Sequence, residues 1–149
     1  MRHGDSRLVR IAVFASGAGS TFRHLVESSK MGELPAEIAL LVTTKAGAPA
    51  AEHAHGAAVE HLFLDPAVLD PAGIDREMCT ALLQRRIDLV VLAGYLRKIG
   101  PRTLEAFAGR ILNTHPGPLP GFGGRGMHGE RVHQAVLDAG LHTTLRPFT

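Results

Sequence analysis

The stretch DLVVLA, from Asp88 to Ala93, decides the fold class of this protein. Leu89, Val90, Val91 and Leu92 follow one another without a polar residue. Because successive side chains of a strand point to opposite faces of a sheet, this strand is apolar on both of its faces. Strands of that kind occur in parallel sheets that are covered by helices on both sides. The stretch therefore predicts an α/β protein.

Strands and helices alternate along the rest of the chain. Four further short runs read as strands: Arg10–Ala15, Ile38–Val42, Val59–Leu64 and Arg110–His115. The segments expected to be helical are Thr21–Ser29, Ala48–His55, Ile74–Arg86 and Gly129–Ala139. This alternation implies right-handed crossovers. We therefore expect a doubly wound, mostly parallel open sheet with helices on both faces.

The apolar side chains of these helices recur at helical spacing. Phe22, Leu25 and Val26 form one stripe, and the third helix carries another that consists of Ile74, Met78, Ala81 and Leu82. We place Arg85 and Arg86 in the last turn of that third helix, where positive charge favours the helix dipole.

Composition sets the outer limits on function. A length of 149 residues suits one domain, residues 1–149, with an N-terminal tail at 1–9 and an atypical C-terminal tail at 141–149. The net charge of +2 is too small to argue for a nucleic-acid partner. The single cysteine, Cys79, allows no intrachain disulfide, and no apolar run approaches the roughly 18 residues of a membrane helix. We therefore expect a cytoplasmic protein without a membrane partner.

The first strand ends in the glycine-containing turn SGAGST, Ser16 to Thr21. Gly17 and Gly19 permit backbone angles that other residues avoid, so that successive N–H groups can face an anion at the start of a helix. The alternative is a tight turn whose glycines only solve a packing problem. We favour a phosphate group over that alternative, and a monophosphate over a dinucleotide, because Phe22 stands where the dinucleotide motif needs a third small residue.

The fourth strand ends in AGYLRKIGP, Ala93 to Pro101. Tyr95 and Leu96 offer apolar surface, and the cations of Arg97 and Lys98 can meet a carboxylate or remain solvated. The pattern alone does not separate a binding segment from a loop that leads into a helix starting at Pro101.

The fifth strand runs into ILNTHPGPLPGF, Ile111 to Phe122. If Leu112 and Thr114 share one face of the sheet, Asn113 and His115 share the other. An uncharged amide and an ionisable imidazole can together stabilise an oxyanion and move a proton. Taken alone, the same two residues are better explained as a simple cap at the end of a strand.

These three strand ends, SGAGS, LAGYLRKI and ILNTHPGPLP, occur in the order found in the folate-dependent formyltransferases. The chain resembles this family from about Arg10 to Gly140, and GMHGERVHQAV, Gly126 to Val136, favours the branch that uses phosphoribosylglycinamide. The resemblance implies that 10-formyltetrahydrofolate donates a formyl group to the substrate amine in purine biosynthesis. It implies small-molecule substrates and no metal.

The resemblance also implies roles for individual residues. Asn113 would stabilise the oxyanion and contact the folate, and His115 would act as the acid. The substrate phosphate would be bound by four residues of the first turn, Gly17, Gly19, Ser20 and Thr21. The folate pocket would be lined by the four residues Leu96, Arg97, Lys98 and Ile99.

The sequence departs from the family pattern in several places. Thr21 stands where Asn is usual, and Pro71 stands where many members carry an Arg toward the folate. No acidic residue follows Asp138, although the family has a catalytic Asp in a later loop. We therefore expect slow formyl transfer; the alternative is a truncated, inactive domain that binds phosphorylated ligands or a partner. A sheet edge exposed at the C-terminus would favour homo-oligomers.

Overall fold

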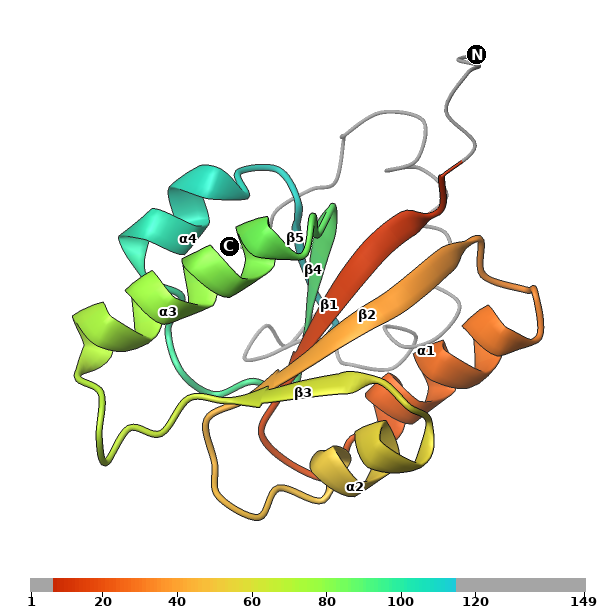
Figure 1. Cartoon of the computed structure of the whole chain (residues 1–149), viewed down its shortest axis with the longest axis horizontal. Coiled ribbons are helices and arrows are strands. Elements are labelled where there is room, and N and C mark those ends of the chain that lie inside the picture. The colour runs from red at the N-terminus through yellow and green to blue at the C-terminus, as the bar shows by residue number, and fades with distance from the viewer. Residues whose placement is uncertain (1–6, 115–149) are drawn as a thin grey trace, which may run out of the picture.

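The computed structural model describes residues 7–114, which form one open sheet flanked by helices (Figure 1). The sheet has five strands in the order β3-β2-β1-β4-β5, and all neighbouring pairs are parallel. The strands are β1 (Val9–Ala15), β2 (Ala36–Thr43), β3 (Glu60–Phe63), β4 (Leu89–Ala93) and β5 (Ile111–Asn113). The predicted α/β fold with a parallel sheet is confirmed.

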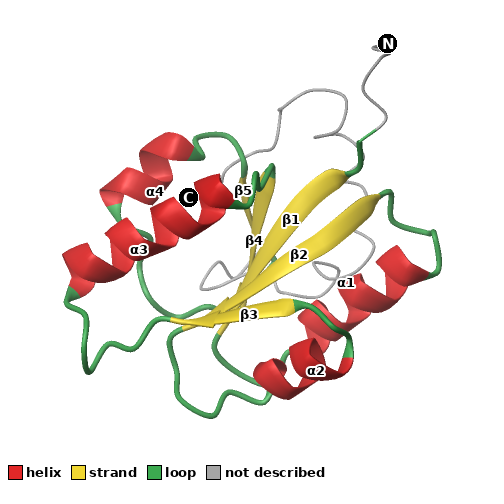
Figure 2. Cartoon of the chain, in the orientation of Figure 1, coloured by secondary structure: helices red, strands yellow, loops and turns green. Residues whose placement is uncertain are grey.

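The helices form a layer on each face of the sheet (Figure 2). One layer contains α1 (Ser20–Lys30) and α2 (Ala50–Gly56). The other contains α3 (Pro71–Gln84) and α4 (Pro101–Ala106). Each layer encloses its own apolar cluster, and the sheet separates the two clusters. The helices on both faces agree with the prediction from strand–helix alternation.

Strand β4 contributes to both clusters, as its uninterrupted apolar sequence predicts. Leu89 and Val91 pack with Phe22 and Leu25 on the α1 and α2 side. Val90 packs on the opposite side, in the cluster that contains the α3 residues Ile74, Met78 and Leu82. The stripes predicted for α1 and α3 are therefore the faces that these helices bury.

Helix α3 begins and ends earlier than the sequence pattern indicates. Its first turn is capped by Asp70, whose Oδ1 accepts a hydrogen bond from Gly73 N at 2.8 Å, and Pro71 occupies the first helical position. The helix ends at Gln84, and Arg86 has a positive φ of 55°, which no helix accommodates. The placement of Arg85 and Arg86 in the last turn was wrong. Arg85 instead forms an ion pair with Glu60 of β3 at 2.6 Å.

The start of the first strand and the end of the last strand also differ from the predicted bounds. Val9 belongs to β1, where it pairs with Ala36, so it is not part of an N-terminal tail. Strand β5 ends at Asn113, although Thr114 N still donates to Leu92 O at 3.0 Å. His115, the helix predicted at Gly129–Ala139 and the tail at 141–149 lie outside the described residues. Within residues 7–114, none of the helices is long and apolar enough to cross a membrane.

Candidate functional site at the carboxyl edge of the sheet

The three segments singled out in the sequence follow three neighbouring strands, β1, β4 and β5. Because these strands are parallel, their carboxyl ends lie at one edge of the sheet. The strand order also reverses direction between β1 and β4, since β2 and β3 lie on one side of β1 while β4 and β5 lie on the other. Ligands of open α/β sheets bind at such a switch point.

The turn after β1 is held tightly against helix α2. Gly19 adopts a left-handed conformation (φ 84°, ψ 23°) immediately before α1, and no side chain within residues 7–114 caps that helix. A Cβ atom at Gly19 would lie 2.6 Å from the Cβ of Ala50, and Ala50 N donates to Gly17 O at 3.3 Å. Glycine is thus required at position 19 for both its backbone angle and its lack of a side chain.

The same turn is joined to the segment after β4. Ser16 is 6% exposed, and its Oγ accepts a hydrogen bond from the backbone N–H of Leu96 at 3.1 Å. The Leu96 side chain itself is 80% exposed. The contact fixes the backbone of the second loop relative to the first and leaves the Leu96 side chain in solvent.

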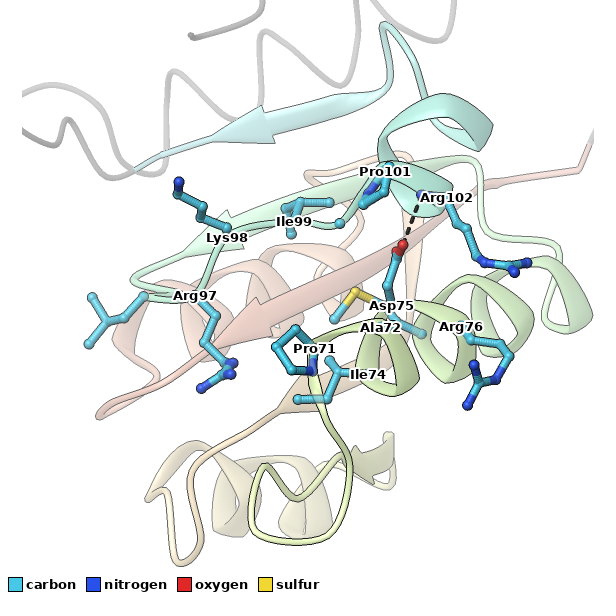
Figure 3. Close-up of a pocket in the computed structure, with 13 residues that line it drawn as sticks. Pro71, Ala72, Ile74, Asp75, Arg76, Arg97, Lys98, Ile99, Pro101 and Arg102 are labelled. Carbon is cyan, nitrogen blue, oxygen red and sulfur yellow. Dashed lines mark hydrogen bonds between the residues drawn. The ribbon is translucent and has the colours of Figure 1, made fainter.

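A cavity of about 720 Å³ lies between the start of α3 and the segment that connects β4 to α4 (Figure 3). Leu96, Arg97, Lys98 and Ile99, the four residues predicted to line a pocket, all line this cavity. The opposite wall was not predicted; it is formed by Pro71, Ala72, Ile74, Asp75, Arg76 and Met78 of α3. The Asp-Pro cap of α3 was the sequence signal for where this wall begins.

The cavity combines apolar walls with an excess of positive charge. Among the described residues, four cations line it, namely Arg76, Arg97, Lys98 and Arg102, against one carboxylate, Asp75. The side chains of Arg97 and Lys98 leave the backbone in opposite directions, and that of Arg97 extends beside Pro71 (Figure 3). Pro71 occupies the position where the family resemblance expects an Arg, and Arg76, Arg97 and Arg102 line the same cavity.

Asp75 is almost completely buried, at 4% exposure, and its carboxylate accepts three hydrogen bonds from within the protein. Its Oδ2 accepts from Arg102 N at 2.8 Å, and its Oδ1 accepts from Thr103 N at 3.0 Å and Thr103 Oγ1 at 2.7 Å. Burial by itself raises the pKa of this carboxyl, but the hydrogen bonds from Thr103 and Arg102, together with the Arg102 charge, bring the pKa below its usual value. Asp75 is therefore a charged carboxylate whose hydrogen bonds connect α3 to the start of α4.

Tyr95 does not offer its ring to the cavity, in contrast to the expectation from sequence. Its ring packs edge-on against Phe14 of β1, with centroids 5.3 Å apart and an interplanar angle of 65°. Burial raises the pKa of the Tyr95 phenol, so the hydroxyl stays protonated at neutral pH. The residue anchors the start of the second loop in the core.

Asn113 lies at the end of β5, opposite Leu92 of β4, and is half-buried. Ile111 packs in the cluster beneath α3 and α4 and Leu112 packs in the other cluster. The alternation of strand side chains puts Asn113 on the Ile111 face, which is also the face that carries the cavity. Asn113 does not itself line the cavity. The next residue along the chain, Thr114, is anchored by its Oγ1, which donates to Leu92 O at 3.1 Å.

An open parallel sheet with a charged cavity beside its switch point is typical of α/β proteins that bind small molecules. Comparison with known proteins identifies the family within that class. The formyl transferase family model matches residues 9–144, and the chain belongs to this family.

The relatives share a more specific name. Phosphoribosylglycinamide formyltransferase, chloroplastic, of Arabidopsis thaliana is 40% identical over 138 residues, which are 91% of this chain and 47% of that protein. Phosphoribosylglycinamide formyltransferase of Bacillus subtilis is 35% identical over 133 residues, or 89% of this chain and 68% of that protein. The crystal structure of glycinamide ribonucleotide transformylase 1 from Geobacillus kaustophilus matches with a TM-score of 0.74 at 40% identity, covering 86% of this chain and 69% of that one. The chain spans about half the length of the plant relatives that it matches, at 47% and 43%.

Proposed function

We propose that this chain transfers a formyl group from 10-formyltetrahydrofolate to the amine of phosphoribosylglycinamide, a step of purine biosynthesis. The observation that carries the proposal is the joining of the two predicted binding loops at the switch point, where Leu96 N donates to Ser16 Oγ at 3.1 Å. Membership of the formyl transferase family and the names of the relatives support the same reaction.

The cavity between α3 and the 96–102 segment suits a folate. Its volume of about 720 Å³ falls within the roughly 300–1,000 Å³ that small-molecule sites occupy. A folate combines a flat apolar ring system with a carboxylate-bearing tail. Ile74 and Ile99 provide apolar contact, and the guanidinium groups of Arg97 and Arg76 provide partners for carboxylates. The net positive charge of the lining favours such an anion over a neutral ligand.

The turn after β1 suits the phosphate of the second substrate. Gly17 and Gly19 precede α1, an 11-residue helix that begins with Ser20 and Thr21 and whose N-terminus is capped by none of the described side chains. The first N–H groups of an uncapped helix are available to an anion, and the helix dipole favours negative charge there. Because these contacts use backbone N–H groups, they do not depend on whether position 21 is Thr or Asn.

The chemistry requires no covalent bond to the protein. The amine nitrogen attacks the formyl carbon, a C–N bond forms, and the carbonyl oxygen becomes an oxyanion. When this intermediate collapses, the bond from the carbon to N10 of the folate breaks. The proton that the attacking nitrogen loses balances the one that N10 gains. Asn113 donates a hydrogen bond to the oxyanion, and His115 acts as the acid.

An assay of the full chain with both substrates tests the proposal. We expect slow but measurable transfer, and we expect Asn113→Ala and His115→Ala each to lower kcat by about 10² to 10³. His55→Ala is the matched control, because His55 is exposed on α2 and belongs to neither loop. If the unaltered chain and both variants are equally inactive while ribose 5-phosphate still binds, the chain is a binding domain and the proposed reaction is wrong.

The proposal includes a cytoplasmic location, small-molecule substrates and no nucleic-acid partner. Within the described residues, Cys79 is a free, half-buried thiol, which suits a reducing compartment. Self-association through the C-terminal part of the chain stays a prediction, since that part lies outside the described residues.

A further inference from the structure

The buried carboxylate of Asp75 lines the cavity, and three of its roughly four acceptor positions are already taken by donors of the protein itself. Its two oxygens accept three hydrogen bonds, from Arg102 N, Thr103 N and Thr103 Oγ1, over distances of 2.7 to 3.0 Å. These donors belong to α4, whereas Asp75 belongs to α3. The carboxylate therefore joins the two opposite walls of the cavity (Figure 3).

Helix α4 depends on this carboxylate for its N-terminal cap. Its own N-cap residue, Gly100, has no side chain to accept a bond, and Pro101 at the first position has no N–H to donate. The first two N–H groups that need acceptors are those of Arg102 and Thr103. Asp75 accepts both, so that the cap is supplied by a neighbouring helix instead of by the preceding residue.

Gly100 allows the two walls to approach this closely. A Cβ atom at position 100 would lie 2.6 Å from Asp75 Oδ2 and 2.7 Å from Asp75 Cβ. Its φ of −78° is ordinary for any residue, so space and not backbone angle requires glycine here. The backbone of the 96–102 segment thus rests directly on Asp75.

We infer that Asp75 is a positioning residue for the folate pocket: by capping α4 it holds the 96–102 wall against α3 and so sets the shape of the cavity. This inference rests on the proposed function for the identity of the ligand. It assigns the second wall of the pocket to α3. Through Asp75 this wall fixes the position of the 96–102 segment, whereas the cations of the cavity are available to the ligand.

The substitution Asp75→Asn distinguishes a positioning role from a purely electrostatic one, because the two predict opposite changes in folate affinity. Asn is similar in size and neutral, and its amide group has only one acceptor for three donors. If charge alone mattered, removing the one carboxylate from a lining that also holds four cations would tighten the binding of an anionic folate. Loss of positioning has the opposite effect, because the wall is no longer held in place.

The experiment measures binding of folic acid to the full chain by calorimetry, together with both KM values. For Asp75→Asn we expect roughly tenfold weaker folic acid binding, since hydrogen bonds to a charged group are lost. We expect the KM for 10-formyltetrahydrofolate to rise by a similar factor while the KM for phosphoribosylglycinamide changes less than about twofold. Glu77→Gln, the same kind of neutralisation at an exposed position of α3, is the matched control and should change neither.

Thr103→Val provides a second variant in case Asp75→Asn does not fold. It removes only the Oγ1 donor at 2.7 Å, keeps both backbone bonds, and should weaken folic acid binding by a smaller factor of about 2 to 5. Folic acid binding by Asp75→Asn that is equal to or tighter than that of Glu77→Gln overturns the inference. A chain that binds folic acid in this Asp75-dependent way but transfers no formyl group overturns the proposed function and leaves the positioning role standing.

Discussion

The backbone N–H of Leu96 donates a hydrogen bond to Ser16 Oγ at 3.1 Å, and this contact joins two loops that are 80 residues apart in the chain. Ser16 directly follows β1, and Leu96 follows β4, which is the neighbour of β1 in the sheet. The proposed phosphate turn and the proposed folate wall are therefore held in one geometry by a buried hydroxyl. Their relative position is what a transfer between two bound substrates requires.

Replacing Ser16 by Ala should affect the relative position of the two loops, and so catalysis, more than it affects the free energy of unfolding. We expect a loss of about 0.5 to 1.5 kcal/mol in the free energy of unfolding, together with a several-fold fall in kcat/KM. Ser29→Ala is the matched control, because Ser29 Oγ donates to Ala36 O at 2.7 Å and joins the end of α1 to the start of β2, away from both loops. Urea denaturation and steady-state kinetics measure the two effects. A loss of kcat/KM as large in Ser29→Ala as in Ser16→Ala would count against a link between the loops.

Gly19→Ala tests the close packing of the first turn. The substitution combines a positive φ of 84° with a Cβ contact of 2.6 Å to Ala50. We expect it to lower the free energy of unfolding by about 2 to 5 kcal/mol, as the sum of backbone strain and overpacking. Gly32→Ala is the control, since Gly32 has a similar φ of 80° with nothing within 4 Å of the added Cβ. The free energy of unfolding of Gly32→Ala should fall only by the backbone strain, about 1 to 2 kcal/mol. Equal losses in urea denaturation would show that Ala50 moves aside.

The stabilising effect of Asp75 should depend on pH in a defined direction. Its pKa in the folded protein lies below the ordinary value of 3.8, so its charged form is favoured by folding. The contribution is then fully present above about pH 4 and is lost as the pH falls through the folded pKa. We expect Asp75→Asn to be about 1 to 3 kcal/mol less stable than the unaltered chain at pH 7. The difference should narrow between about pH 4 and pH 2.

Urea denaturation of both proteins across this pH range measures the effect. Glu77→Gln serves as the control, because Glu77 is exposed and should show little difference at any pH. A gap between Asp75→Asn and the unaltered chain that widens on acidification would contradict the assigned charge state.

Arg97→Gln tests the role of the cations that line the cavity. Arg97 lines the cavity beside Pro71, and its loss removes a guanidinium that can bind a carboxylate with two hydrogen bonds. We expect the KM for 10-formyltetrahydrofolate to rise about tenfold with little change in kcat, since this contact is the same in the ground state and the transition state.

Arg86→Gln is the matched control for charge. Arg86 is exposed beyond the end of α3 and does not line the cavity. Added salt should raise the KM of the unaltered chain more than that of Arg97→Gln. If the two arginine variants have the same folate KM, Arg97 does not contact the co-substrate.

The sequence by itself determined the fold class and predicted the place of the candidate site. The unbroken apolar run at Leu89–Leu92 required burial on both faces of a strand, and that pattern is local because side chains alternate along every strand. Alternating strands and helices then implied parallel pairing, which brought the segments after β1, β4 and β5 to one edge. The four residues Leu96–Ile99 were recognised as a binding segment because the family motif marks them. The roles of Asn113 and His115 stay predictions.

Only the tertiary structure decided which distant groups meet at that edge. The bond between Ser16 and Leu96, the cap that Asp75 gives to α4, and the wall that α3 gives to the cavity each join segments far apart in the chain. No periodicity encodes such contacts. They depend on the crossing of whole helices and on glycines, such as Gly100, that let two backbones approach. Local patterns specify elements, whereas the partners of a buried polar group are set by the packing of those elements.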